Sequence, residues 1–149
     1  MKLLFVCTGN ICRSPMAAVL AHHLGQARGL PIETRSAGTL DLGPRPAERH
    51  AQAVVAELGL ALDAHLAHQV TPEDLAWADH VLCMELEHAV RLRAMDPALA
   101  HKVELLGPYA GVPELPDPMG GWRRTFRTCR DQLARALGAY LDRVDALDA

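Results

Sequence analysis

Residues 3–16 read LLFVCTGNICRSPM, and this stretch determines the fold that we expect for the chain. Its first four residues are apolar without polar alternation, which is typical of a strand buried on both faces of a parallel sheet. A turn containing Gly9 follows, and Ser14 with Pro15 then predicts a helix start in which Ser14 is the N-cap. Apolar residues recur at helical spacing from Met16 onward. The stretch therefore predicts a strand, a loop and a helix in succession.

The rest of the chain repeats this alternation of short apolar runs and helical patterns. Further strands are expected at residues 32–36, 80–84 and 102–106, and further helices at residues 48–58, 85–95 and 121–144 and from residue 71 onward. Trp122 and Phe126 are expected to begin the apolar stripe of the last helix. Strands separated by helices indicate an α/β fold with three layers, α/β/α, and a central parallel sheet, formed by residues 1–149 as a single domain. The ligand site of such a fold lies at the carboxyl ends of the strands.

The composition argues against several classes of partner. The 149 residues are half hydrophobic and carry a formal net charge of −3, so no general affinity for nucleic acid or for a membrane surface is expected. The first apolar run is too short for a membrane span or a secretory signal, and the expected location is cytoplasmic. The four cysteines are too few and too unevenly spaced for the disulfide framework of a small secreted domain.

The loop after the first strand has the features of a phosphate site. Cys7 and Arg13 are separated by five residues, and a loop of this kind that curls onto a helix start points its backbone N–H groups into one concavity. Gly9 permits close backbone approach, Asn10 tolerates a left-handed conformation, and Arg13 offers a planar fork for two phosphate oxygens. The residues predicted to bind phosphate beside Arg13 are Thr8, Gly9, Asn10, Ile11, Cys12 and Ser14.

Cys7 is the candidate nucleophile. The helix start, the converging amides and Arg13 favour its thiolate, which is the reactive form. Ser14 can donate a hydrogen bond to the sulfur and assist it as a leaving group, whereas Thr8 and Ile11 are expected to contribute mainly backbone and loop shape. The alternative is that Cys7 ends a buried strand as a small apolar residue, which is what an arbitrary cysteine usually does.

The residues from Cys7 to Ala17 resemble the N-terminal phosphate loop of the low-molecular-weight protein tyrosine phosphatases. Other segments resemble that family in the same order, namely Ser36-Ala37-Gly38-Thr39, His65, Gln69 to Leu75, Val81 to Met84, and Asp117-Pro118. The resemblance implies hydrolysis of phosphate monoesters through a phosphocysteine, with no metal and no cofactor. It implies as substrate a phosphotyrosine-containing protein or a small aryl phosphate, with inorganic phosphate as product.

Asp117 is the candidate general acid and base. A departing alcohol needs a proton, so the reaction requires an acid on a segment separate from the phosphate loop. On composition alone Asp117 would more often be a turn residue or an N-cap. The resemblance reverses that expectation, because the family places its general acid in an Asp-Pro pair at this point of the chain.

The other cysteines leave two further activities open. The resemblance implies that Cys12 forms a reversible disulfide with Cys7, and the alternative is a buried inert thiol. Cys83 and Cys129 are interpreted as core residues. Arsenate reductases share the scaffold but need a relay of further cysteines, and no second cysteine lies close after Cys83. The other alternative is a module that binds phosphate without hydrolysing its esters. The presence of the complete set of reactive residues, Cys7, Arg13, Ser14 and Asp117, argues against it.

Several positions depart from the family pattern. Most of the eight histidines are expected to be solvated and none predicts a metal site, while His65 matches a position that supports the phosphate loop. The family commonly has aromatic residues where this chain has Met119-Gly120 and Leu40-Asp41-Leu42, so weaker stacking on a substrate ring is expected. The segment Glu48-Arg49-His50-Ala51 also differs from the family pattern, which has Asp-Pro-Arg-Ala there. Ile11 favours an aryl substrate, since relatives that act on phosphoarginine tend to have Thr there.

Overall fold

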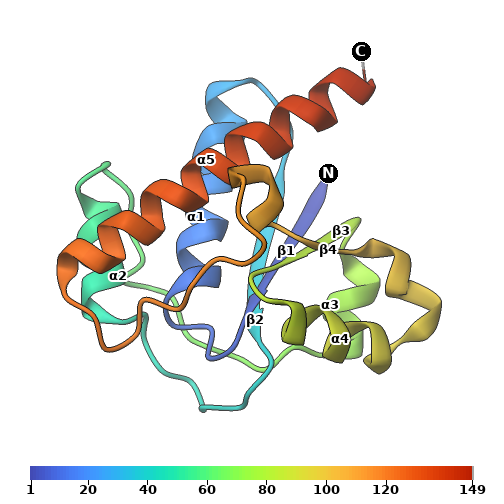
Figure 1. Cartoon of the computed structure of the whole chain (residues 1–149), viewed down its shortest axis with the longest axis horizontal. Helices are drawn as coiled ribbons and strands as arrows, with labels where there is room; N and C mark the ends of the chain where they lie inside the picture. Colours follow the sequence, from blue (N-terminus) through green and yellow to red (C-terminus); the bar gives the residue numbers. More distant parts are fainter. Residues whose placement is uncertain (149) are drawn as a thin grey trace.

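The computed structural model describes residues 1–148 and contains a four-stranded parallel sheet between two layers of helices (Figure 1). The strands are β1 (Lys2–Cys7), β2 (Glu33–Gly38), β3 (His80–Cys83) and β4 (Val103–Leu105), in the spatial order β2-β1-β3-β4. All three pairings are parallel, and Cys7 at the end of β1 pairs with Gly38 at the end of β2. The expected α/β fold with a parallel sheet is confirmed.

The two faces of the sheet bury separate clusters of apolar side chains. The strand β1 supplies both, because Leu3 and Phe5 point into one cluster and Leu4 and Val6 into the other, all of them fully buried. The first cluster is covered by α1 (Arg13–Ala27), α2 (Arg49–Ala56) and α5 (Arg123–Asp148), and the second by α3 (Pro72–Trp77) and α4 (Leu86–Met95). Burial of β1 on both faces explains its continuous apolar sequence.

Local signals in the sequence explain several helix starts. Helix α3 begins with a reciprocal capping box, because the Thr71 hydroxyl accepts from the Asp74 backbone N–H and the Asp74 carboxylate accepts from the Thr71 N–H. Helix α2 is capped by Glu48, whose carboxylate accepts from the His50 N–H at 2.6 Å. Glu48 also donates its own N–H to the Ile11 carbonyl oxygen, which ties α2 to the phosphate loop.

Three expectations about the elements were wrong. Helix α1 begins at Arg13 with Cys12 at the N-cap, so Ser14 is inside the first turn and its hydroxyl is free for other bonds. Helix α5 begins at Arg123 rather than before Trp122, which is 81 % exposed, so the apolar stripe begins at Phe126. Two short 3₁₀ helices, η1 (Pro97–Lys102) and η2 (Gly107–Ala110), flank β4 and were not expected. Within residues 1–148, no helix combines the length and the apolar character needed to cross a membrane.

Candidate active site

The loop between β1 and α1 is organised around the side chain of Asn10. Asn10 is fully buried and has a φ of 58°, the left-handed conformation that the sequence predicts for a curled loop. Its Oδ1 accepts from the His68 N–H at 3.1 Å, and its Nδ2 donates to the hydroxyls of Ser14 and Ser36 at 2.8 and 3.0 Å. The His65 Nε2 lies 2.7 Å from the Asn10 carbonyl oxygen, which is the supporting position expected for His65.

Ser14 lies between Asn10 and the Cys7 sulfur. Its oxygen accepts the amide proton of Asn10, because an Nδ2 group can only donate. The Ser14 hydroxyl proton has two acceptors within reach, the Cys7 Sγ at 3.0 Å and the more distant Ala37 carbonyl oxygen at 3.4 Å. Cys7 itself is 3 % exposed at the end of β1. The geometry agrees with the expected role of Ser14 as a donor to this sulfur.

Gly38 allows the loop to approach the neighbouring strand. A Cβ atom at this position would lie 2.7 Å from the Thr8 carbonyl oxygen and 3.1 Å from the Asn10 nitrogen, both of which are backbone atoms. The Thr39 and Leu40 N–H groups then donate to the carbonyl oxygens of Cys7 and Thr8. A larger residue at position 38 would displace the loop, which gives a physical reason for glycine in the Ser-Ala-Gly-Thr segment.

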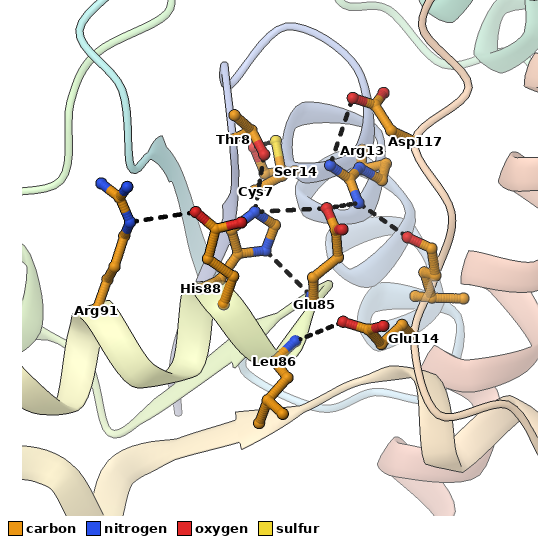
Figure 2. Close-up of polar contacts among 12 residues, drawn as sticks. Cys7, Thr8, Arg13, Ser14, Glu85, Leu86, His88, Arg91, Glu114 and Asp117 are labelled. Atoms are coloured by element: carbon orange, nitrogen blue, oxygen red, sulfur yellow. Dashed lines mark hydrogen bonds and ion pairs between the residues drawn. The ribbon is translucent and has the colours of Figure 1, made fainter.

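Arg13 is buried behind the loop and is held along one edge of its guanidinium group (Figure 2). The Nη1 donates to the Glu85 Oε2 and to the Leu115 carbonyl oxygen, both at 2.8 Å. On the other edge, the Nη2 lies 3.7 Å from the Asp117 Oδ2, and the Nε is buried without any partner among the residues that the structure describes. One fork of the guanidinium is thus anchored and the other is open to an anion.

A cavity of about 190 Å³ opens above Cys7 and Arg13. Its remaining lining residues come from the phosphate loop, from the segment after β2 and from the segment before α5, and they are Thr8, Gly9, Ile11, Cys12, Leu40, Leu42, Arg45, Asp117 and Met119. The walls are therefore mainly aliphatic and contain no aromatic side chain among the described lining residues, which is consistent with the weaker stacking on a substrate ring that the sequence predicts. A cavity with aliphatic walls and with Arg13 in its lining suits an apolar organic group that carries a phosphate.

Asp117 faces this cavity from a loop that is tied to α4. The Leu115 N–H donates to the Met84 carbonyl oxygen at 3.0 Å, and the Glu114 carboxylate accepts from the Leu86 N–H at 2.8 Å. Asp117 follows with its side chain about half exposed, and its Oδ1 accepts from the Met119 N–H. The residue therefore shapes a turn, and its other carboxylate oxygen points toward Arg13 (Figure 2).

All four cysteines are free and buried. Cys12 lies in the phosphate loop with its Sγ 3.8 Å from the Met119 Sδ, and burial, followed by the charge of Asp117, raises the pKa of its thiol. Burial raises the pKa values of Cys83 and Cys129 to about 12. Cys83 lies in the cluster on the opposite face of the sheet from Cys7. Both of these cysteines are core residues, as expected.

Two site residues, Glu85 and His88, were missed in the sequence. Glu85 holds Arg13, and His88 is 1 % exposed although most histidines were expected to be solvated. The His88 Nε2 lies 2.9 Å from the Thr8 hydroxyl. Burial lowers the pKa of His88, and the positive charge of Arg13 lowers it further. The available signal was a Glu-x-x-His pattern at a helix start immediately after a buried strand.

Comparison with known proteins identifies the family. The family described as low molecular weight phosphotyrosine protein phosphatase matches residues 2–148. A protein-arginine-phosphatase of Geobacillus stearothermophilus is 36 % identical over 135 residues, covering 89 % of this chain and 88 % of that protein. The low molecular weight protein-tyrosine-phosphatase Etp of Escherichia coli (strain K12) is 34 % identical over 144 residues, covering 96 % and 94 %.

Solved structures agree with this assignment. A YwlE mutant from Bacillus subtilis superposes with a TM-score of 0.92 at 31 % identity, covering 97 % of this chain and 99 % of that chain. A low molecular weight protein tyrosine phosphatase from T. tengcongensis gives a TM-score of 0.91 at 32 % identity, covering 96 % and 99 %. The chain belongs to the low molecular weight phosphotyrosine protein phosphatase family.

Proposed function

We propose that the protein is a protein tyrosine phosphatase in which Cys7 is the nucleophile, Arg13 the phosphate clamp and Asp117 the general acid and base. The observation that carries this proposal is the open edge of the Arg13 guanidinium, whose Nε is buried without a partner beneath the cavity that holds Cys7. A buried donor of this kind leaves a desolvation cost that a bound oxyanion offsets. Two parallel N–H groups match two oxygens of a phosphoryl group.

The first step transfers the phosphoryl group to sulfur. The Cys7 thiolate attacks phosphorus, an S–P bond forms, and the bond from phosphorus to the ester oxygen breaks as the Asp117 carboxyl group gives its proton to that oxygen. Arg13 and the loop amides stabilise the charge on the three equatorial oxygens. The position of the Asp117 carboxylate beside Arg13, 3.7 Å from its Nη2, supports the approach of this acid to a phosphate held by Arg13.

The second step releases phosphate. The Asp117 carboxylate takes a proton from water, the water oxygen attacks phosphorus, and the S–P bond breaks to return the Cys7 thiolate. The Ser14 hydroxyl, 3.0 Å from the sulfur, favours this departure by donating to the thiolate as it forms. The sum of both steps is hydrolysis of a phosphate monoester to an alcohol and inorganic phosphate.

The cavity walls support an aryl substrate. The side chains of Ile11, Leu40 and Leu42 offer aliphatic contact and no hydrogen-bond acceptor for a cationic guanidinium, and Met119 adds only a weak thioether acceptor. The only carboxylate in the lining is that of Asp117, which already faces Arg13. A phosphotyrosine ring buries apolar surface against these walls, whereas a phosphoarginine side chain would leave N–H groups without partners.

Phosphoarginine is nevertheless the second candidate substrate, for a specific reason. The protein named as an arginine phosphatase and the protein named as a tyrosine phosphatase are similar to this chain at nearly equal identity, 36 % and 34 %. Overall identity therefore does not separate the two substrates. The difference has to come from the lining of the cavity.

A comparison of two matched peptides tests the substrate assignment. The peptides differ only in carrying phosphotyrosine or phosphoarginine, and kcat/KM is measured for the wild type and for Ile11→Thr. We expect the kcat/KM of the wild type to be at least about tenfold higher for phosphotyrosine than for phosphoarginine. In Ile11→Thr this ratio should be smaller, because the shorter side chain buries less apolar surface against the aryl ring and so binds it more weakly. Leu58→Thr, an exposed aliphatic position outside the cavity, serves as the matched control. Faster cleavage of phosphoarginine by the wild type would contradict the proposal.

A further inference from the structure

His88 contacts the phosphate loop from the first turn of α4, and its side chain is buried there (Figure 2). Its two ring nitrogens have different partners. The Nδ1 lies 3.1 Å from the Glu85 backbone nitrogen and accepts its N–H, so it carries no proton. In a neutral ring the proton is then on Nε2, which lies 2.9 Å from the Thr8 Oγ1. The backbone of α4 thus fixes the tautomer.

The surroundings favour the neutral form of the ring. Burial lowers the pKa of His88, as does Arg13 on α1, against the opposing charges of Glu85 and Glu87 at the start of α4 and of Asp117 on the loop before α5. A second proton on Nδ1 would point at the Glu85 N–H, which is itself a donor. Protonation of His88 would therefore break the bond that orients the ring.

This tautomer determines what the Thr8 hydroxyl can do. The Thr8 Oγ1 accepts the His88 Nε2–H, so the hydroxyl proton of Thr8 is directed away from the ring. This hydroxyl has no second partner among residues 1–148, and Thr8 lines the cavity together with Cys7 and Arg13. The sequence predicted that Thr8 binds phosphate mainly through its backbone, because nothing local to the loop indicates a buried histidine beside its hydroxyl.

We propose that His88 is a positioning residue that turns the Thr8 hydroxyl into a hydrogen-bond donor for the anion bound in the cavity. The proposal rests on the proposed function only in that the anion is a phosphoryl group or inorganic phosphate. The N-cap residue of α4, Glu85, also holds Arg13 through its carboxylate at 2.8 Å. The start of α4, which lies outside the phosphate loop, therefore orients two donors of the site. Glu85 orients the Arg13 guanidinium, and His88 orients the Thr8 hydroxyl.

Two substitutions of His88 separate positioning from helix capping. In His88→Asn the amide oxygen can replace Nδ1 and accept the Glu85 N–H, but the donor to Thr8 is lost. In His88→Gln the longer side chain can place its amide nitrogen near the former Nε2 and donate to Thr8, but the cap is lost. A purely structural role predicts that both variants lose stability and that neither has a selective effect on anion binding.

Calorimetric titration with inorganic phosphate tests the proposal in the wild type, His88→Asn, His88→Gln, Thr8→Val and the double variant His88→Asn/Thr8→Val. We expect Thr8→Val and His88→Asn each to weaken phosphate binding about tenfold, as expected for a lost bond to a charged group. The double variant should bind no more weakly than either single variant, because both remove the same donor. His88→Gln should bind phosphate within about twofold of the wild type and unfold at a lower urea concentration.

Three results would overturn the proposal. These are unchanged phosphate affinity in Thr8→Val, unchanged affinity in His88→Asn, and losses that multiply in the double variant. If His88→Asn does not fold, the comparison of Thr8→Val with His88→Gln decides the question, since a positioning role requires the first to lose affinity and the second to keep it. Failure of the wild type to bind phosphate would instead contradict the proposed function.

Discussion

Arg13 uses the two edges of its guanidinium group differently. The Nη1 is bonded to Glu85 and to the Leu115 carbonyl oxygen, whereas on the other edge the Nε has no partner among the described residues and the Nη2 has only the Asp117 carboxylate, 3.7 Å away. Because the anchored edge fixes the plane of the group before any anion arrives, little side-chain entropy is lost on binding. A lysine could not divide its donors in this way, so we regard the planar fork as a requirement of the site.

The substitution Asp117→Asn tests whether Asp117 is a general acid or only a residue that shapes a turn. The substitution keeps an oxygen that can accept from the Met119 N–H, so the turn should remain. We expect hydrolysis of phenyl phosphate to slow by on the order of 10² to 10⁴-fold, and that of nitrophenyl phosphate to slow much less, because nitrophenolate departs with little protonation.

Asp41→Asn is the matched control for that experiment. Asp41 is also exposed and accepts from the backbone N–H two residues on, at Gly43, and it lies between the lining residues Leu40 and Leu42. The Asp41→Asn substitution should leave the rates of hydrolysis of both phenyl phosphate and nitrophenyl phosphate unchanged. Equal losses on the two substrates in Asp117→Asn would show that Asp117 acts through packing alone.

Cys12 gives a second prediction for a single residue. We propose that peroxide oxidises the Cys7 thiolate to a sulfenic acid and is reduced to water, and that the Cys12 thiol then condenses with it to a disulfide and releases a second water. The wild type should recover fully on reduction, whereas Cys12→Ser should remain inactive after the same exposure. Activity assays before and after reduction measure this, with the buried Cys129→Ser as a control that recovers. Full recovery of Cys12→Ser would exclude the disulfide.

Among the elements, the first strand and helix could be predicted because their signals are local. The buried run of β1, the left-handed Asn10 and the Cys-x5-Arg spacing all lie within one short segment. The contribution of α4 could not be predicted, since the burial of His88 depends on which face of α4 meets the loop. The exposure of Trp122 follows from a helix start only two residues later than expected, which removes that residue from the apolar stripe.

His65 and His88, which both contact the phosphate loop, predict that the stability of the fold depends on pH. Burial lowers the folded-state pKa values of His65 and His88 below their ordinary 6.5. The unfolded chain therefore takes up protons at a higher pH than the folded protein. The stability that these groups contribute is fully present above about pH 6.5 and is lost as the pH falls toward their folded-state values.

Urea unfolding at several pH values measures this effect. Each such group adds at most about 1.4 kcal/mol per pH unit to the slope of the unfolding free energy. His88→Asn and His88→Gln should both show a shallower slope below pH 6.5 than the wild type, since neither side chain titrates. A slope that is unchanged in both variants would mean that His88 has the same pKa in the folded and unfolded states.

On the scale of the whole molecule, the parallel sheet gathers distant parts of the chain at one end. The phosphate loop follows β1, Gly38 ends β2, Glu85 and His88 follow β3, and Asp117 lies on the loop before α5. Because parallel strands end at the same edge, these segments meet without any of them being adjacent in sequence. The two buried clusters pack against both faces of the sheet behind this edge, which suits a site that depends on fixed donors.

The most direct test of the whole account is to isolate the covalent intermediate. A phosphotyrosine peptide is mixed with the wild-type protein, the reaction is quenched in acid within one turnover, and the digested protein is examined by mass spectrometry. We predict a phosphoryl group on Cys7, greater accumulation when water attack is slowed in Asp117→Asn with nitrophenyl phosphate, and none in Cys7→Ala. Turnover of the peptide by Cys7→Ala, or a phosphoryl group carried by another residue of the wild type, would contradict the account.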